Sequence, residues 1–388
     1  MTAVRLVSPD GSLYDHSLSG VFSGLAGKSS APFDRVLFAA AHVVANPLVM
    51  HDPSSEAPLD WDATLQFRHH LWSLGFGVAE AMDTAQRGSG LSWQSALDLI
   101  ERSTREARST PGARLAAGVG TDHLLPGPHS LSAIEAAYLQ QCEAVERTGA
   151  QLIVMASRAL AAAASTPEDY SRIYRRILDQ TREPVILHWL GDMFDPALTG
   201  YWGSDDVAIA METCLSIIAE RSDKVDGIKI SLLDKDMEIA MRRRLPSGVR
   251  MYTGDDFNFS SLIAGDEIGY SDALLGIFDP IAPVAAAAFE HHARQDLDGY
   301  RALMEPTEAL SRMVFSAPTR FYKTGVVLLA YLNGHQTHFS MIGAQQAMRS
   351  IPHLCEVFRL ADQAGLFVDG DVSAHRMKAI LAVNGLEQ

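Results

Sequence analysis

A lysine interrupts an apolar stretch that is typical of a buried strand. In the segment VDGIKIS, residues 225–231, Lys229 lies between Ile228 and Ile230. Unpaired lysines are rare in protein interiors, because a charge in an apolar environment is costly. Burial lowers the pKa of an amine from its usual value of about 10.4, and a neutral amine forms a Schiff base with a ketone or an aldehyde. Unless its side chain reaches solvent beyond the strand, Lys229 indicates aldol, retro-aldol or dehydration chemistry.

Other apolar runs also end in side chains that can carry protons, charge or a metal ion. They are His42 and Asn46, Asp83 and Thr84, Asp122 and His123, Ser157 and Arg158, His188, Ser231, Asp255 and Asp256, and Ser271 and Asp279. Each has an ordinary structural explanation, since an aspartate that follows a strand often caps the next helix, as we expect for Asp256. Three histidines, several aspartates and one lysine exceed what capping requires, so we expect a functional site.

The elements that must position these residues alternate regularly along the chain. Short apolar runs lie at 35–44, 75–82, 114–120, 151–157, 184–190, 225–231, 249–255 and 271–277. Helical patterns occupy 60–73, 92–108, 129–148, 168–181, 204–221, 234–245 and 257–265. Apolar strands that alternate with helices are typical of a parallel sheet covered on both faces. Eight such units over about 250 residues predict an α/β fold, a (β/α)8 TIM barrel, with its active site at the carboxyl ends of the strands.

Three regions are expected around this barrel. Residues 1–33 contain a hairpin with a turn at Asp10-Gly11 and form an N-terminal extension. The barrel occupies residues 34–295. Residues 296–388 are predicted to form a C-terminal helical layer, because the pattern there becomes entirely helical.

Composition and charge narrow the range of partners. The formal net charge is −15 and the isoelectric point is about 5.3, which disfavours nucleic acid and anionic membranes. Three widely spaced cysteines are typical of a reducing compartment, and neither a signal peptide nor a run long enough to cross a bilayer is evident. We therefore expect a cytoplasmic protein with a small-molecule partner.

Several motifs resemble one enzyme family. GIKIS at 227–231 and YTGDDFNFSSLIAG at 252–265 are similar to the sixth and seventh strand regions of the dihydrodipicolinate synthase / N-acetylneuraminate lyase family. Further similarity lies at 116–123, 143–155, 271–283 and 323–334, so the resemblance covers roughly residues 35–335. It implies a (β/α)8 barrel, a homodimer or homotetramer, and a lyase of the class I aldolase type without a cofactor. It also implies that Lys229 forms the Schiff base.

Departures from the family pattern point to a different carbonyl substrate. The turn that holds the carboxylate of pyruvate in the family is MDTAQRG here, residues 82–88, and places Asp83 beside that position. At ~4 Å, two negative charges repel by about 4 kcal/mol at an effective dielectric constant of ~20. The family's tyrosine after the fifth strand is His188, and its paired tyrosines after the fourth strand are replaced by SRAL. The chain thus resembles a divergent subgroup of unknown function.

The resulting hypothesis assigns a role to each candidate residue. Lys229 is the nucleophile, His188 moves protons near neutral pH without a large pKa shift, and Thr84 relays a proton or positions substrate. The predicted substrate-binding residues are Asp83, His123, Asp255 and Ser231. The substrate is a keto acid or a keto-sugar derivative, and dihydrodipicolinate synthesis is not expected.

Two alternatives keep the same fold. In the first, His42, Asp83, His123, His188 and Asp255 bind Zn²⁺ or Mn²⁺ in a metal-dependent lyase, isomerase or hydrolase. No local motif such as HExxH supports this set, so its ligands must converge from separate strands. In the second, the barrel binds a ligand without catalysing a reaction, and its rim is apolar and closed.

Overall fold

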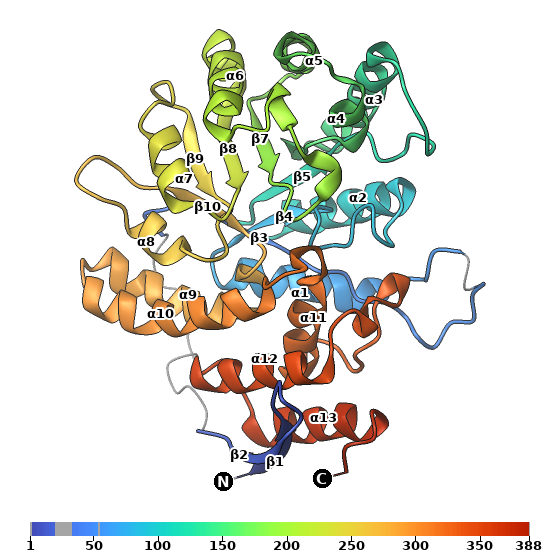
Figure 1. The fold of residues 1–388 in the computed structure, drawn as a ribbon, viewed down its shortest axis with the longest axis vertical. Helices are drawn as coiled ribbons and strands as arrows, with labels where there is room; N and C mark the ends of the chain where they lie inside the picture. The colour runs from blue at the N-terminus through green and yellow to red at the C-terminus, as the bar shows by residue number, and fades with distance from the viewer. Residues whose placement is uncertain (1, 20–32, 53–54, 388) are drawn as a thin grey trace.

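Eight parallel strands close into a barrel in the computed structural model, which describes residues 2–19, 33–52 and 55–387 (Figure 1). The strands are β3 (Leu37–Ala40), β4 (Gly77–Glu80), β5 (Leu115–Val119), β6 (Gln151–Val154), β7 (Val185–Leu190), β8 (Val225–Ser231), β9 (Arg250–Thr253) and β10 (Asp272–Leu275). Each pairs with the next, and β10 pairs with β3, so the sheet has no free edge. The predicted (β/α)8 barrel is confirmed.

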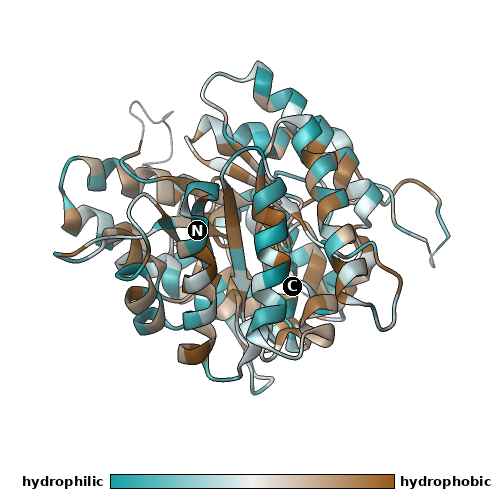
Figure 2. Ribbon diagram, turned by 90° about the horizontal axis from the view of Figure 1, so that it is seen from above, coloured by the Kyte–Doolittle hydropathy of each residue, from teal (hydrophilic) through white to brown (hydrophobic). Residues whose placement is uncertain are grey.

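Helices connect successive strands and cover the outside of the barrel. They are α1 (Trp61–Ser73), α2 (Trp93–Ser109), α3 (Leu131–Thr148), α4 (Arg158–Ala163), α5 (Pro167–Gln180), α6 (Val207–Glu220), α7 (Lys235–Arg242) and α8 (Phe259–Ala264). Capping residues fix where several of them begin, since the side chains of Asp60, Ser92 and Ser130 accept hydrogen bonds from the first turns of α1, α2 and α3. Figure 2 shows the apolar strands at the centre and the mixed polar and apolar helices around them.

Side chains from alternate strand positions fill the interior of the barrel. This layer consists of Phe38, Ala40, Ala79, Met82, Ala116, Ile153, Ile186, Tyr252 and Leu274. Tyr252 occupies the space next to Gly227, where an added Cβ would lie 2.6 Å from its ring. The inward row of β8 therefore begins with a residue that has no side chain and continues with Lys229, because successive inward positions are two residues apart.

A second layer of helices packs against one side of the barrel. It contains α9 (Phe278–Ala293), α10 (Leu297–Val314), α11 (Lys323–Leu332), α12 (Ile351–Gln363) and α13 (Gly370–Val383). The hairpin of β1 (Ala3–Val7) and β2 (Leu13–Ser17) lies against α12 and α13, so both ends of the chain lie on this side (Figure 1). One hydrophobic core joins these helices, the hairpin, α1 and part of the barrel. Most of the predicted 1–33 extension after Ser19 lies outside the described residues.

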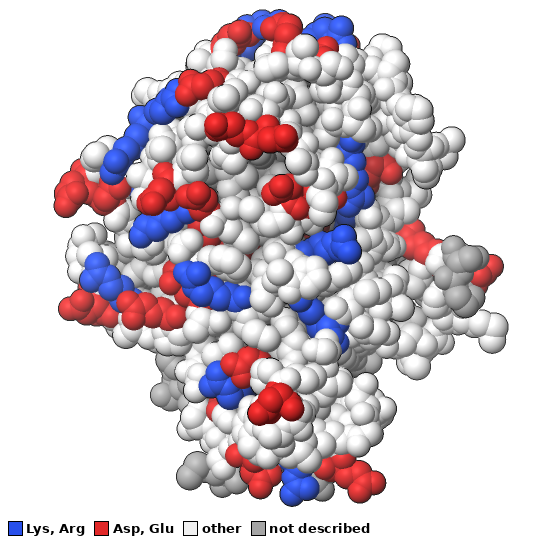
Figure 3. Space-filling view, viewed as in Figure 1, with Lys and Arg blue, Asp and Glu red and all other residues white. Residues whose placement is uncertain are grey.

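Acidic and basic side chains are interspersed on the face of the molecule drawn in Figure 3. Ion pairs also join neighbouring elements: Arg175 of α5 pairs with Glu220 of α6, and Arg244, which follows α7, pairs with Glu212 of α6. Among the described residues, no helix is long and apolar enough to cross a bilayer.

A fully buried ion pair fixes the ends of the first two barrel strands. Arg68 of α1 donates two hydrogen bonds to the carboxylate of Glu80, at 2.9 and 2.8 Å, and a third to the carbonyl oxygen of His42. Both side chains are inaccessible to solvent. Each therefore depends on the other for compensation of its charge.

Replacement of this carboxylate is expected to destabilise the fold strongly. Glu80→Gln leaves the Arg68 charge buried without a counter-ion, which should lower the free energy of unfolding by about 3–5 kcal/mol. Glu143→Gln is the matched control, because its pair with Arg147 is exposed and should contribute less than about 1 kcal/mol. Urea unfolding measures both, and equal losses for the two variants would contradict the assignment.

Candidate active site

Lys229 lies inside the barrel, at the carboxyl end of β8. Its neighbours Ile228 and Ile230 belong to the outer core beneath the helices, so the side chain of Lys229 points to the opposite face, into the barrel. It is 4% exposed. Gly254, directly after β9, makes room for it, since an added Cβ would lie 2.8 Å from Cε of Lys229. Within the described part of the chain, the amine has no hydrogen-bond or ion-pair partner.

Two carboxyl groups near Lys229 are driven toward opposite protonation states. Burial alone would raise the pKa of Asp83, but the charges of Lys229 and Lys323 outweigh it, and this pKa lies below its usual value of 3.8. Burial raises the pKa of Asp256 well above 3.8, and the nearby charge of Asp83 adds to that rise. One group is thus an ionised acceptor and the other a neutral acid, which is the division that general acid–base catalysis needs.

A chain of hydroxyl groups ends on Asp83. Tyr322, directly before α11, donates to Oδ2 of Asp83 at 2.6 Å. The hydroxyl oxygen of Tyr322 also lies 2.7 Å from Oγ1 of Thr84. Because the proton of Tyr322 is already donated to Asp83, Thr84 is the donor in this second bond. Burial and the charge of Asp83 raise the pKa of Tyr322 well above 10, so its hydroxyl remains protonated. Thr84, Tyr322 and Asp83 together form a directed path for a proton.

His188 of β7 lies opposite Lys229 in the strand register. Its Nε2 is 3.4 Å from Oγ of Ser231, and both side chains are buried. Burial and the charge of Lys229 lower the pKa of His188 well below 6.5, and Asp83 opposes the shift only in part. The prediction that His188 titrates near neutral pH is therefore wrong. The imidazole is neutral and can exchange hydrogen bonds with a ligand, but it does not supply a cationic acid.

Aromatic rings cover this group of polar residues. Phe315 stacks on Tyr322 with ring centroids 4.3 Å apart, and Phe194 contacts both at 6.2 and 6.3 Å. Residues that follow His188 and Ser231 in the chain, such as Leu190 and Leu232, line a cavity of about 290 Å³ at the adjacent outer surface. The groups around Lys229 are charged or hydrogen-bonding, so the site is polar. A barrel that only binds a ligand was expected to have an apolar rim.

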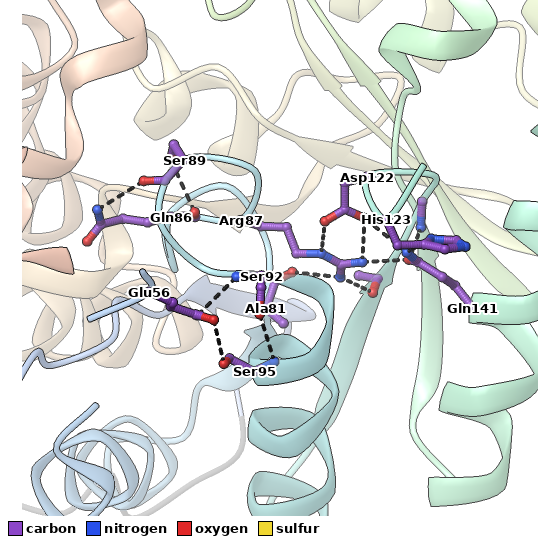
Figure 4. Close-up of polar contacts among 12 residues, drawn as sticks. Glu56, Ala81, Gln86, Arg87, Ser89, Ser92, Ser95, Asp122, His123 and Gln141 are labelled. Atoms are coloured by element: carbon purple, nitrogen blue, oxygen red, sulfur yellow. Dashed lines mark hydrogen bonds and ion pairs between the residues drawn. The ribbon is translucent and has the colours of Figure 1, made fainter. Parts of the chain in front are cut away.

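The loop after β4 holds Asp83 and Thr84 in place through Arg87 (Figure 4). The guanidinium group of Arg87 donates to both oxygens of Asp122 at 2.8 and 2.9 Å, and to the carbonyl oxygen of Gly118 at 2.7 Å. It also donates to Gln141 of α3. The loop that carries two candidate site residues is thus fixed to β5 and α3.

Two predicted substrate-binding residues, His123 and Asp255, have other partners. His123 belongs to the Arg87 network, where it contacts Gln140 and Gln141 of α3 (Figure 4). Asp255 caps the following turn, because its carboxylate accepts bonds from the amides of Phe257 and Asn258 and from the side chain of Asn258. The prediction that Asp256 caps this turn is wrong, because its carboxylate instead accepts a hydrogen bond from the amide of Ile277.

His42, the remaining member of the predicted metal-binding set, bonds through Nδ1 to Asp279 at 2.7 Å and packs on Phe67. Across residues 2–19, 33–52 and 55–387, no three histidine, cysteine or acidic side chains are arranged to hold a metal ion. Of the five predicted ligands, Asp83 and His188 both lie near Lys229. His42, His123 and Asp255 have separate partners, so the set does not converge.

Sequence reasoning missed Tyr322, Lys323 and the site-facing role of Asp256. Lys323 is the first residue of α11 and is 6% exposed, and its amine donates to Oγ of Ser89 at 3.3 Å. A signal for Lys323 existed, because a lysine before the apolar run GVVLLAYL is unusual in a buried helix. Nothing in the sequence places Tyr322 beside Thr84.

A buried glutamate supports the strand ends beneath Asp255. Glu238 of α7 accepts hydrogen bonds from Thr253 at 2.8 Å and from Ser271 at 2.6 Å. Thr253 in turn accepts from the amide of Asp255. Burial raises the pKa of Glu238 from 4.5 to about 8, so the native state favours its protonated form.

This shift predicts a pH-dependent loss of stability. The contribution of protonated Glu238 is fully present below pH 4.5 and is lost as the pH rises toward 8. Glu238→Gln should match the wild type near pH 4 and exceed it by roughly 3–5 kcal/mol at pH 8, as urea unfolding at both values would show. Glu212→Gln is the control with the opposite sign, because Arg244 lowers the pKa of Glu212. Parallel curves for wild type and Glu238→Gln would contradict the prediction.

The fold of the chain is similar to that of solved structures of dihydrodipicolinate synthases. The synthase from Thermotoga maritima has 14% identity and a TM-score of 0.65 over 86% of this chain and 99% of its own. The synthase from Acinetobacter baumannii, solved with pyruvate, has 15% identity and a TM-score of 0.64 over 86% and 99%. A prophage protein of the same family from E. coli K12, also with pyruvate, has 11% identity and a TM-score of 0.62 over 91% and 99%. The resemblance indicated by the sequence is confirmed at the level of fold.

The chain belongs to the family described as protein of unknown function DUF993, whose model matches residues 4–386. The match includes the hairpin and all five helices of the C-terminal layer, as well as the barrel. A comparison with curated proteins gives no match.

Proposed function

We propose that the protein is a Schiff-base-forming lyase of the class I aldolase type that acts on a carbonyl compound. The observation that carries this proposal is the buried amine of Lys229, which has no partner among the described residues and lies near carboxyl groups of opposite protonation preference. A structural lysine at such a position would be expected to have a counter-ion within bonding distance. A nucleophile instead requires a free lone pair and nearby groups that accept and donate protons.

The first half of the reaction assigns a role to Asp256. The nitrogen lone pair of Lys229 attacks the carbonyl carbon, and a proton moves from nitrogen to the former carbonyl oxygen to give a carbinolamine. The protonated carboxyl group of Asp256 then gives its proton to that hydroxyl group, which leaves as water. The nitrogen keeps one hydrogen and a positive charge as an iminium ion, and Asp256 is left ionised. Neutral His188 hydrogen-bonds the oxygen during these steps.

The second half assigns a role to Asp83. Its carboxylate accepts the proton of the substrate hydroxyl group two carbons from the iminium carbon. The O–H electrons form the carbonyl group of the leaving fragment, and the electrons of the broken C–C bond pass to the iminium ion, which becomes an enamine. Oδ2 of Asp83 already accepts the hydroxyl of Tyr322, whereas Oδ1 is buried without a partner in the described structure. Oδ1 is therefore the acceptor in this scheme, and the Thr84–Tyr322 path exchanges the proton.

The predicted homodimer or homotetramer stays a prediction.

Reduction with borohydride should attach a carbonyl ligand to Lys229. Incubation with a panel of ketones and aldehydes, followed by borohydride and peptide mass spectrometry, should give a mass increase on the peptide that contains Lys229. Lys229→Met should abolish this product. Lys378→Met, on the outer helix α13, is the control and should retain it. A product that persists in Lys229→Met, or one that maps to Lys323, would contradict the assignment of the nucleophile.

Loss of the acid at Asp256 should slow adduct formation without loss of the fold. Asp256→Asn keeps an oxygen that can accept the amide of Ile277 but removes the transferable proton. Because general acid catalysis contributes about 10²–10⁴-fold, the single-turnover rate of trapping should fall by that factor. The wild-type rate should also decline as the pH rises through the raised pKa of Asp256, and the variant should lack this decline. An unchanged rate with an unchanged unfolding midpoint would exclude this role.

A further inference from the structure

We infer that the substrate is an uncharged, hydroxylated carbonyl compound rather than a keto acid, because Asp83 has a buried carboxylate oxygen without a hydrogen-bond donor in the described structure near Lys229. This inference rests on the proposed Schiff-base function and specifies the substrate class for the same site.

The unpaired oxygen is Oδ1 of Asp83. It is buried and has no hydrogen-bond partner in the part of the chain that the structure describes, while Oδ2 accepts from Tyr322 at 2.6 Å. A buried acceptor without a donor is costly, so a ligand that supplies a donor is favoured. A hydroxyl group supplies that donor. A substrate carboxylate or phosphate dianion offers only acceptors and would be repelled by the charge of Asp83.

The compensating charge comes from Lys323, at the start of α11. Its amine is buried and has one hydrogen bond, to the neutral hydroxyl of Ser89, and it lies 5.5 Å from the ring centroid of Tyr322. Its charge lowers the pKa of Asp83 and is one of the causes of the ionised state of that group. The neighbouring cation Arg158 is already paired with Asp195. Lys229, Lys323 and the hydroxyl of Tyr322 together favour the ionised form of Asp83 and lower its pKa.

Charge balance through the reaction leads to the same substrate class. The attack uses the unprotonated form of Lys229. Burial raises the pKa of Asp256 and favours its uncharged form, so the remaining charges at that step are those of Asp83 and Lys323. After water has left, the iminium ion is matched by ionised Asp256. The covalent intermediate is then neutral overall if the substrate carries no charge. A keto acid would bring one further negative charge into a closed site next to Asp83, where burial of an uncompensated charge is strongly unfavourable.

Two matched pairs of ketones test the inference directly. Hydroxyacetone and pyruvate differ in that a CH₂OH group replaces the carboxylate, and dihydroxyacetone and hydroxypyruvate differ in the same way. Wild-type protein is incubated with each at equal concentration and reduced with borohydride, and the modification of Lys229 is measured by mass spectrometry. We expect each uncharged ketone to give more product than its anionic partner, by a factor of about ten or above.

Asp83→Asn should reverse this preference. The variant removes the negative charge and places an amide donor in the site, so trapping of pyruvate should rise about ten-fold or more, while trapping of hydroxyacetone falls. Asp192→Asn is the matched control, because Asp192 is exposed in the loop after β7, and it should leave the ratio unchanged. The wild-type ratio provides a test even if Asp83→Asn does not fold.

The outcomes separate this inference from the proposed function. Equal or greater trapping of the keto acids on Lys229 would overturn the inference and leave the Schiff-base function intact. Absence of any product on Lys229 with all four ketones would overturn both. A preference for the uncharged ketones that disappears in Asp83→Asn would support the inference.

Discussion

The rest of the site depends on one constraint. Several opposite charges are buried together, away from water, in the mouth of the barrel. Lys229, Lys323 and Asp83 are close enough that the charge of each lysine lowers the pKa of the aspartate. Burial disfavours charge, so Asp83 is ionised only because cations lie near it. The same burial favours the neutral forms of His188 and Asp256. A change in the charge of one group therefore alters the protonation of the others, and the group is best understood as one electrostatic unit.

The barrel supplies only part of this unit. Lys229, His188 and Asp83 come from strands or from the loops that follow them, as in other TIM barrels. Tyr322 and Lys323 come from the helical layer, which packs against the barrel through a continuous apolar core. The layer thus contributes more than a stabilising surface, because it provides both the hydroxyl bonded to Asp83 and the cation that compensates it.

Sequence reasoning was most successful where the signal is local. Alternation of apolar runs with amphipathic segments predicts the eight strands, because that pattern reflects burial on both faces of a sheet. Lys229 is recognisable because a charge interrupts one run. The turn is capped by Asp255 and not by Asp256 as predicted, since adjacent residues in a turn point in different directions and only the path of the backbone decides which one caps it. His123 and Tyr322 depend on contacts between distant segments, which the sequence does not specify.

The bond between Thr84 and Tyr322 joins residues 238 positions apart in the chain. Long loops must close before such contacts form, and domains of this size commonly fold through intermediates. During synthesis, the barrel strands leave the ribosome well before α11 does. A nascent chain that ends after β10 has Lys229 but neither the hydroxyl of Tyr322 nor the amine of Lys323, so the group of residues around Asp83 is completed only late in biosynthesis.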